Sequence, residues 1–458
     1  MHSKKKNDYI TGTGERLSFG LYAFGTILSY YMVLSYLQIY MTDVGIPAVA
    51  VGMIFIAAKV WDAVNDPIFG VIVDKVHLKG GKYKPWLRIA TMAIPITTIL
   101  MFIIPSGASA QVKIIWSSVA YVLWDTAYTM CDVPMNALVT AMTENQTERN
   151  QLYSLSAFFV YLGGLLVAIF VPTLYPSIGW NLTAVILGIL CFAGMIPLNL
   201  KCKERYAGTS EEEASVTDIL LSLVRNKYLL IYTLAAIIGS ITDFANTLNG
   251  YVAIHCLGGE SYITLLSLAT AVPVMFVVLF VPRLLKKFDK FNLFVITRVA
   301  TILVSIVIFL VGYGNLSLLL GLIVLKSLFS GVWGVTAVMF IADCVEYGQF
   351  RNGERNQGIA FATKAFTNKI IVAITGALGM FGLAAFGFVE GANVAQSAAT
   401  VQGIWLLYAI GPIVGSILCV IIMLAAYKLR DQDVAVMIRC NNGELTKEEA
   451  EKMLSRKI

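Results

Sequence analysis

Two carboxylates, Asp62 and Asp66, lie four residues apart within a long apolar run of the sequence. This spacing places both on one helix face, and burying such charges in a membrane is costly. They also repel each other unless a proton or a cation joins them. Pro67 leaves the carbonyl oxygen of Ala63 without its helical donor, and hard cations prefer oxygen ligands. The pattern predicts a site for Na⁺ or H⁺; the alternative is a structural ion pair between Lys59 and one carboxylate.

A second group of polar residues falls in the apolar run over residues 112–143. Asp125 and Asp132 are seven residues apart and therefore lie near the same helix face. Pro134 frees another backbone carbonyl beside Asp132. We expect Asp132 to bind substrate hydroxyls, the cation or both, and the Thr129 hydroxyl lies about one turn away. A structural role is the alternative for each Asp.

Charged residues also interrupt the apolar runs of the second half. Lys369 needs an acidic partner or water, and we expect an Asp of the other half to pair with it; snorkelling to the surface is the alternative. Lys364 would add attraction for an anionic sugar if it faces a cavity. Asp243, followed by Asn246 and Asn249 on successive turns, either lines a cavity or hydrogen-bonds a neighbouring helix.

Aromatic residues complete the set of candidates. Sugar rings stack on aromatic faces, although lipid-facing and interfacial positions are the commoner setting for aromatic residues in membrane spans. Tyr31 and Trp124 fall at suitable depths but are not assigned a role. The substrate-binding candidates are Asp132, Tyr128, Asn136, Tyr30, Trp333 and Lys369.

The composition is that of a polytopic membrane protein. Of 458 residues, 58% are hydrophobic and 14% are charged, with a mean hydropathy of +0.75, whereas soluble domains carry about 25% charge. The net charge of +6 does not indicate nucleic acid, because the basic residues lie in short loops between apolar runs. Only three His occur and no nucleophile–base arrangement is visible. We therefore expect no enzyme and no cofactor other than a coupling ion.

The apolar runs predict an all-α protein with two six-helix bundles around a central cavity. A span needs about 20 apolar residues. Twelve such runs lie near residues 18–43, 48–74, 86–106, 112–143, 152–175, 179–200, 229–255, 262–284, 292–313, 315–345, 358–388 and 403–428. The predicted parts are an N-terminal bundle (1–200), a cytoplasmic central loop (201–228), a C-terminal bundle (229–428) and a cytoplasmic tail (429–458).

The distribution of basic residues predicts the orientation. Lys and Arg crowd alternate loops, such as residues 75–88 and 201–205, while the opposite loops carry little beyond Lys113. Both termini of this multi-pass cell-membrane protein are therefore expected in the cytoplasm. In the tail, Thr446 and Glu449 have the spacing of a helix capping box.

With these residues in view, the chain resembles the glycoside–pentoside–hexuronide:cation symporters of the major facilitator superfamily, the group that contains the melibiose permease. The resemblance rests on residues 61–67 with 81–86, on 128–134, on 342–348 and on Asn368-Lys369. It implies Na⁺- or H⁺-coupled uptake of a glycoside by alternating access. It also implies that Asp62 and Asp66 are the cation carboxylates.

The resemblance further implies that Thr129 lies near the cation and that Asp132 contacts both sugar and cation. The coupling network would consist of Lys59, Lys369 and Asp243. The sequence departs from melibiose-type members at Thr26, Ile27, Ala157 and Asn136, which predicts another glycoside or a sugar acid as substrate. The alternatives are a transport-inactive membrane sugar sensor and a proton-driven exporter of apolar compounds.

Overall fold

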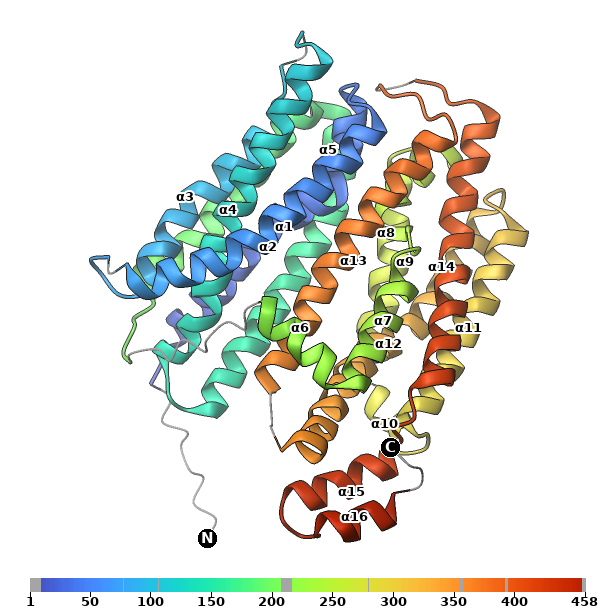
Figure 1. Ribbon diagram of the computed structural model, residues 1–458. Coiled ribbons are helices and arrows are strands. Elements are labelled where there is room, and N and C mark those ends of the chain that lie inside the picture. Colours follow the sequence, from blue (N-terminus) through green and yellow to red (C-terminus); the bar gives the residue numbers. More distant parts are fainter. Residues whose placement is uncertain are drawn as a thin grey trace, which may run out of the picture. The chain divides into compact units, whose positions relative to one another are not determined.

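The computed structural model describes residues 10–76, 78–105, 107–206, 216–278, 280–353, 357–391 and 394–454. Within these ranges the chain is helical and contains no strand. It divides into two compact units, Met1–Glu213 with Glu390–Val394, and Ala214–Val389 with Ala395–Ile458. Figure 1 follows the helices of each unit along the chain.

Five long helices form the first unit: α1 (Thr13–Asp43), α2 (Ala48–Lys75), α3 (Lys84–Met101), α4 (Ala110–Met142) and α5 (Gln146–Lys201). Helix α5 contains the two predicted spans 152–175 and 179–200, separated by Gly179, whose φ of +80° lies in the left-handed region. Glycine adopts this conformation without steric cost. Helix α1 packs along α5, α3 packs against α4 and α5, and α2 packs against α4.

Close packing of α1 on α5 depends on small residues. A Cβ at Gly25 of α1 would lie 2.6 Å from the carbonyl oxygen of Cys191, and a Cβ at Gly194 of α5 would lie 3.1 Å from that of Leu21. Small residues of this kind let two helix backbones approach within a membrane. The pair therefore holds α1 against α5 within the first unit.

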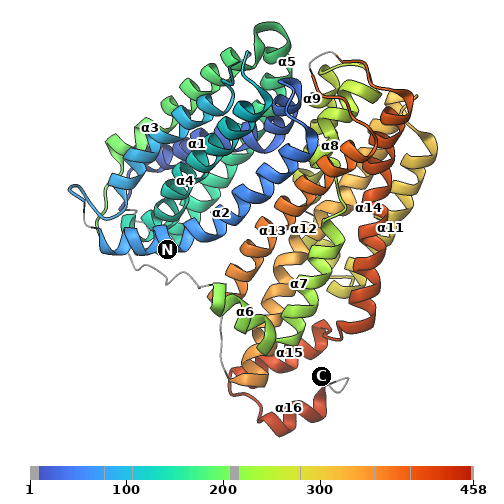
Figure 2. The ribbon, with the colours of Figure 1, turned by 45° about the horizontal axis from the view of Figure 1, so that its top comes forward.

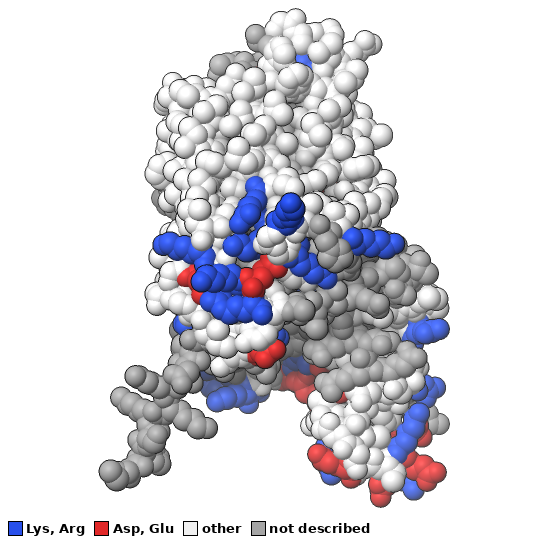
Figure 3. Space-filling view, turned by 90° about the vertical axis from the view of Figure 1, so that its left-hand side faces the viewer, with Lys and Arg blue, Asp and Glu red and all other residues white. Residues whose placement is uncertain are grey.

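Charged side chains gather at one end of the first unit. The Glu204 carboxylate accepts hydrogen bonds from the backbone N–H groups of residues 82–84, at 2.6–3.0 Å, and Arg205 pairs with Glu15 at 2.8 Å. The start of α1, the start of α3 and the end of α5 thus meet there. Figure 3 shows Lys, Arg, Asp and Glu gathered below a broad surface that carries almost none of them.

The second unit consists of the remaining helices: α6 (Val216–Arg225), α7 (Lys227–Ser240), α8 (Ala245–Tyr251), the π-helix η1 (Val252–Cys256), α9 (Ser261–Val278), α10 (Val281–Leu285), α11 (Lys290–Val311), α12 (Leu316–Asn352), α13 (Gln357–Ala385), α14 (Ala398–Ala426), α15 (Asp431–Asn441) and α16 (Lys447–Met453). Helix α12 packs against α9 and α11, and α14 packs against α7 and α11. Figure 2 shows α7, α12 and α13 as neighbours, in agreement with their contacts.

The predicted span over residues 229–255 is not one continuous helix. The helix breaks between α7 and α8, and there the Thr242 hydroxyl donates to the carbonyl oxygen of Gly411 at 2.8 Å. A Cβ at Gly411 would lie 2.0 Å from the Thr242 carbonyl oxygen, and one at Gly415 would lie 2.5 Å from its hydroxyl. The broken segment therefore fits against two glycines of α14.

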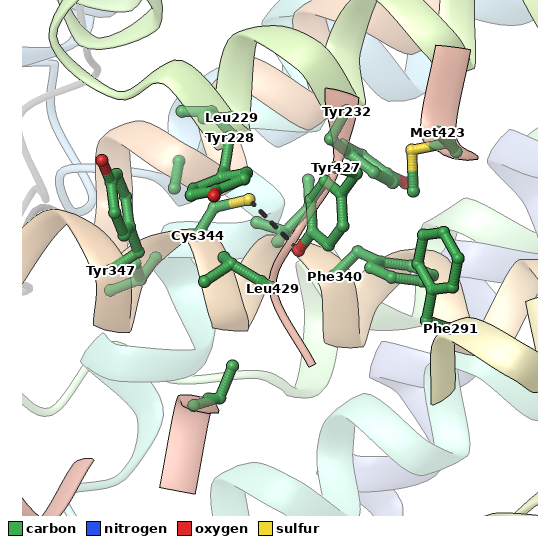
Figure 4. Close-up of a cluster of buried hydrophobic side chains, with 14 of the residues drawn as sticks. Tyr228, Leu229, Tyr232, Phe291, Phe340, Cys344, Tyr347, Met423, Tyr427 and Leu429 are labelled. Atoms are coloured by element: carbon green, nitrogen blue, oxygen red, sulfur yellow. Dashed lines mark hydrogen bonds between the residues drawn. The ribbon is translucent and has the colours of Figure 1, made fainter. Parts of the chain in front are cut away.

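The tail helices α15 and α16 belong to the core of the second unit. An aromatic cluster that includes Tyr228, Phe340 and Tyr427 extends to Met437 of α15 and Ala450 of α16. Figure 4 shows the centre of this cluster, with Cys344 Sγ and the Tyr427 hydroxyl 3.9 Å apart. The capping box predicted for Thr446 is confirmed at the start of α16.

Ionic contacts hold the same tail in place. The Lys290 ammonium lies 2.6 Å from Asp343 of α12 and 3.4 Å from Asp431 of α15. The Arg430 guanidinium lies 3.6 Å from the centre of the Phe291 ring. Salt bridges and a cation–π contact therefore hold the tail against the second unit in addition to its apolar contacts.

Seven of the described helices are long and apolar enough to cross a membrane, namely α1, α2, α5, α11, α12, α13 and α14, and two shorter apolar helices lie in α7 and α9. Helix α5 counts once here although it contains two predicted spans. The remaining predicted spans correspond to α3 and α4.

Candidate functional site

Helices α2 and α4 bring the predicted carboxylates and a lysine together inside the first unit. The Lys59 ammonium lies 3.2 Å from Asp62 on its own helix and 3.9 Å from Asp125 on α4. Both carboxylates are buried, with Asp62 only 6% exposed and Asp125 only 3% exposed. Lys59 therefore links the two helices as well as forming the intrahelical pair considered above.

The Thr129 hydroxyl of α4 is the second link to α2. This hydroxyl donates a hydrogen bond to Asp66 Oδ1 at 3.0 Å and accepts one from the Asn65 side-chain amide at 2.9 Å. One turn earlier, the Trp61 indole donates to the Thr126 hydroxyl at 3.0 Å. The Thr129 hydroxyl thus lies beside the Asp66 carboxylate, and oxygen atoms of this kind are the ligands that a hard cation prefers.

Aromatic side chains form a group next to this charged cluster. The rings of Tyr30, Trp124 and Tyr128 lie 5.3–6.4 Å apart, centre to centre, and the Trp124 indole donates to Ser29 at 2.8 Å. Asp132, one turn beyond Tyr128 on α4, is exposed. An aromatic surface beside an accessible carboxylate can bind a polyol by stacking and hydrogen bonding.

The other predicted residues lie in the second unit. Trp333 and Lys364 line one small pocket, and Lys369 is half-buried on the same helix, α13. Asp243 lies half-buried in the break between α7 and α8. Asn249 donates to Ser267 at 3.3 Å, so of the two alternatives for that residue the structure favours a contact with the neighbouring helix.

Three predicted features fall on side chains that are not described. These are the side chains of Asn136 and Asn246 and the ring of Pro67. Among the described residues, no three His, Cys, Asp or Glu side chains lie close enough to hold a metal ion.

Sequence reasoning missed three residues. Asn65 lies between the two predicted carboxylates, and its contact with Thr129 depends on how α2 packs on α4. Arg298 interrupts the apolar run 292–313, and its guanidinium lies 4.5 Å from the centre of the Trp333 ring. The position of Arg298 inside an apolar span was enough to mark it as a candidate functional residue. Tyr232, also on the pocket wall, carried no distinguishing signal.

Outside the spans, Glu148 ties α5 to the chain before α1. Its buried carboxylate accepts from the Thr11 backbone at 2.8 Å, from the Thr11 hydroxyl, and from the Thr143 hydroxyl at 2.6 Å. Burial alone would raise the pKa of Glu148, but these hydrogen bonds outweigh it and hold the pKa below its usual value. This contact is structural and lies apart from the cation candidates.

The fold is shared with solved structures of membrane transporters. Solved structures of similar fold include the nucleoside transporter NupG, with a TM-score of 0.67 over 91% of this chain and 99% of that one, at 14% identity. The chain therefore has the major facilitator fold.

The family follows from the sequence comparisons. The family model for MFS/sugar transport proteins matches residues 18–431. The chain is 30% identical to the uncharacterized symporter YnaJ of Bacillus subtilis over 93% of this chain and 94% of that protein. It is 28% identical to an isoprimeverose transporter of Lactiplantibacillus pentosus, over 88% and 86%. The chain belongs to this family of multi-pass membrane transporters, as its resemblance to glycoside symporters implied.

Proposed function

We propose that the protein is a secondary active transporter that couples the inward movement of Na⁺ or H⁺ to uptake of a glycoside or sugar acid. The observation that carries the proposal is that α2 carries Asp62, paired with Lys59, and one turn later Asp66, which accepts a hydrogen bond from Thr129 of α4. Carboxylates inside an apolar span are costly unless they are paired or bind a cation or a proton. The similarity to a symporter and to a sugar transporter supports both the coupling and the substrate class.

The charge distribution supports an orientation with both termini in the cytoplasm. The charged end of the first unit, where α1 and α3 begin and α5 ends, carries most of that unit's basic residues. Positive loops stay on the cytoplasmic side. Placing a single cysteine within the 202–227 segment tests this, because labelling by an impermeant reagent added outside intact cells would contradict it.

The coupling step follows from electrostatics. A cation between Asp62 and Asp66 removes their mutual repulsion and so favours the state that binds substrate. Asp132, with the aromatic group of Tyr30 and Tyr128, would hold the sugar on the same unit. One cation that crosses inward gains about 2.3 kcal/mol per 100 mV of membrane potential, which can drive uptake against a gradient.

Transport by purified protein in vesicles tests the proposal. Labelled glycosides and uronides are offered with an inward Na⁺ gradient, an inward H⁺ gradient, or neither. Asp62→Asn and Asp66→Asn should abolish uphill accumulation, while Glu448→Gln, at an exposed carboxyl of α16, should leave it intact. Wild-type accumulation in both Asp variants would refute the cation assignment.

The same vesicles separate the two rival functions. Tight glycoside binding without any uptake would indicate a sugar sensor. Outward, H⁺-driven movement of an apolar compound with no glycoside binding would indicate an exporter.

A further inference from the structure

Helix α6 ends where the apolar part of the second unit begins. Only Asn226 separates it from α7, which is apolar along its whole length. Asn226 has an extended backbone, with φ of −119° and ψ of 94°, so the chain turns there and α6 does not continue the direction of α7 (Figure 2). The ten residues of α6 are too few to cross a bilayer, and short apolar helices of this length are typical of its interface. This geometry favours a position for α6 at the membrane surface.

Polar contacts with α12 fix the turn between α6 and α7. The Asn226 side-chain amide donates to the carbonyl oxygen of Cys344 at 2.6 Å, and its side-chain oxygen accepts from the backbone N–H of Leu229 at 3.1 Å. The Asn352 side-chain amide donates to the carbonyl oxygen of Arg225 at 3.2 Å. The fold therefore holds Arg225, the last residue of α6, in a defined place.

Helix α6 also has an exposed apolar face. Leu221 is 47% exposed and Val224 is 79% exposed, and their spacing of three residues places them on one face of the helix. Leu223, by contrast, packs against the aromatic cluster of the second unit. A helix with one apolar face left uncovered at a membrane boundary is typical of helices that lie among lipid headgroups.

A pocket lies beside this face, between α6, α7, α12 and α13. Its volume is about 100 Å³, and its wall includes Leu221, Ser222, Arg225 and Asn352. Arg225 is the only charged residue among the described residues of the wall. It has no carboxylate within ion-pair distance in the described part of the chain. Whole small-molecule ligands occupy about 300–1,000 Å³, so this pocket has room for one end of a larger molecule, such as a phosphate group.

The pocket and the apolar face together match the two parts of an anionic phospholipid. A guanidinium binds two oxygens of one phosphate through its planar fork, and the Ser222 hydroxyl can donate a further hydrogen bond. Lys227, which is exposed at the start of α7, adds a second positive charge. Basic residues next to a membrane span attract anionic lipids. A free phosphate ion would fill only the pocket and would leave Leu221 and Val224 uncovered.

We propose that α6 and this pocket form a binding site for an anionic phospholipid. Its phosphate group would contact Arg225 and Ser222, and its acyl chains would lie on Leu221 and Val224. In the cytoplasmic orientation proposed above, the lipid belongs to the inner leaflet. This partner is separate from the coupling cation and from the sugar, so the inference does not depend on coupled transport. A bound lipid would join the ends of four helices and stabilise the second unit.

Lipid binding to the purified full-length protein tests the proposal directly. Dioleoylphosphatidylglycerol and dioleoylphosphatidylcholine have the same acyl chains, but the first is anionic and the second is zwitterionic. Native mass spectrometry should show the first phosphatidylglycerol bound at least about fivefold more tightly than the first phosphatidylcholine, the effect expected of one basic residue near an anionic headgroup. Phosphatidylglycerol should also raise the melting temperature more than phosphatidylcholine does. Inorganic phosphate should not raise it, because it lacks acyl chains.

Variants locate the effect. Arg225→Gln should weaken phosphatidylglycerol binding about fivefold and change phosphatidylcholine binding much less, whereas Arg225→Lys, which keeps the charge, should retain most of the preference. Val224→Gln should weaken both lipids alike, because it removes apolar contact only. Lys452→Gln, at an exposed lysine of α16 that does not line the pocket, is the matched charge-loss control and should match wild type.

The outcomes also separate this inference from the proposed function. Equal affinity for the two lipids in the wild type, or unchanged phosphatidylglycerol affinity in Arg225→Gln, would overturn the lipid site. An equal loss in Lys452→Gln would indicate a general effect of net charge and would overturn it too. Stabilisation by inorganic phosphate as large as that by phosphatidylglycerol would assign the pocket to a soluble anion instead. Lipid binding that depends on Arg225, in protein that accumulates no glycoside, would uphold the site and overturn the coupled transport.

Discussion

Removal of Lys59 should tighten binding of the coupling cation. Its ammonium lies 3.2 Å from Asp62 and 3.9 Å from Asp125. At an effective dielectric constant of about 20, these distances correspond to about 5 and about 4 kcal/mol of Coulomb attraction, much of which desolvation offsets. Removing one member of a buried pair costs about 3–5 kcal/mol, since the remaining charge is left unpaired. A cation that binds at Asp62 in Lys59→Met would recover part of that cost and would meet no repulsion from the ammonium.

The expected shift is large enough to measure. If only about 1.4 kcal/mol is recovered, the half-saturating cation concentration falls about tenfold. Cation-dependent ligand binding to purified protein is the suitable assay, because it is independent of transport rate. Lys59→Arg keeps the charge and should stay within about threefold of wild type. Unchanged or weaker cation affinity in Lys59→Met, in protein that still binds its glycoside, would refute the reasoning.

Three further outcomes follow from contacts described above. Thr129→Val should weaken cation affinity about tenfold, because a charge-assisted hydrogen bond is lost. Thr126→Val, one turn away, should leave cation affinity unchanged. Cation titrations of the two variants measure this, and an equal loss of affinity in both would contradict it. Glu148→Gln should lower the free energy of unfolding by about 1–3 kcal/mol at pH 7. Because the pKa of Glu148 is lowered in the folded state, the advantage of wild type exists above the unfolded pKa of about 4.3 and is lost as the pH falls through the folded value. Thermal melts carried from neutral pH to well below this unfolded pKa measure it, and a difference that stays constant over the whole range would argue against it. Gly25→Ala should lower the melting temperature because its Cβ meets a backbone oxygen at 2.6 Å, while Gly321→Ala, with open space around it, should be neutral or stabilising.

The sequence predicted the parts of the site that depend on spacing along one helix. Asp62 and Asp66 could be placed on α2, and Thr129 on α4, because i, i+4 periodicity is local. Pairing between helices could not be predicted in this way. The contact of Lys59 with Asp125 depends on the register of α2 against α4, which is set by the packing of many side chains.

The break after α7 was missed for a similar reason. Apolar composition alone favours one continuous span over residues 229–255, and the interruption is accommodated by Gly411 and Gly415 on a helix about 170 residues later in the chain. Arg298 is a different case, because its position inside an apolar run was visible in the sequence. Its role depends on contact with Trp333, which only the fold provides.

The docking of the tail has a consequence for synthesis of the protein. Met437 and Ala450 are core residues of the second unit, so that unit cannot complete its interior until residue 450 has been made. From the start of α7 this takes roughly 10–40 s at typical elongation rates. During that interval the aromatic surface around Tyr228 and Phe340 lacks its cover. We therefore expect the nascent second unit to depend on the translocation machinery or a chaperone until its tail has docked, and truncations within α15 or α16 should increase degradation even where every membrane helix is intact.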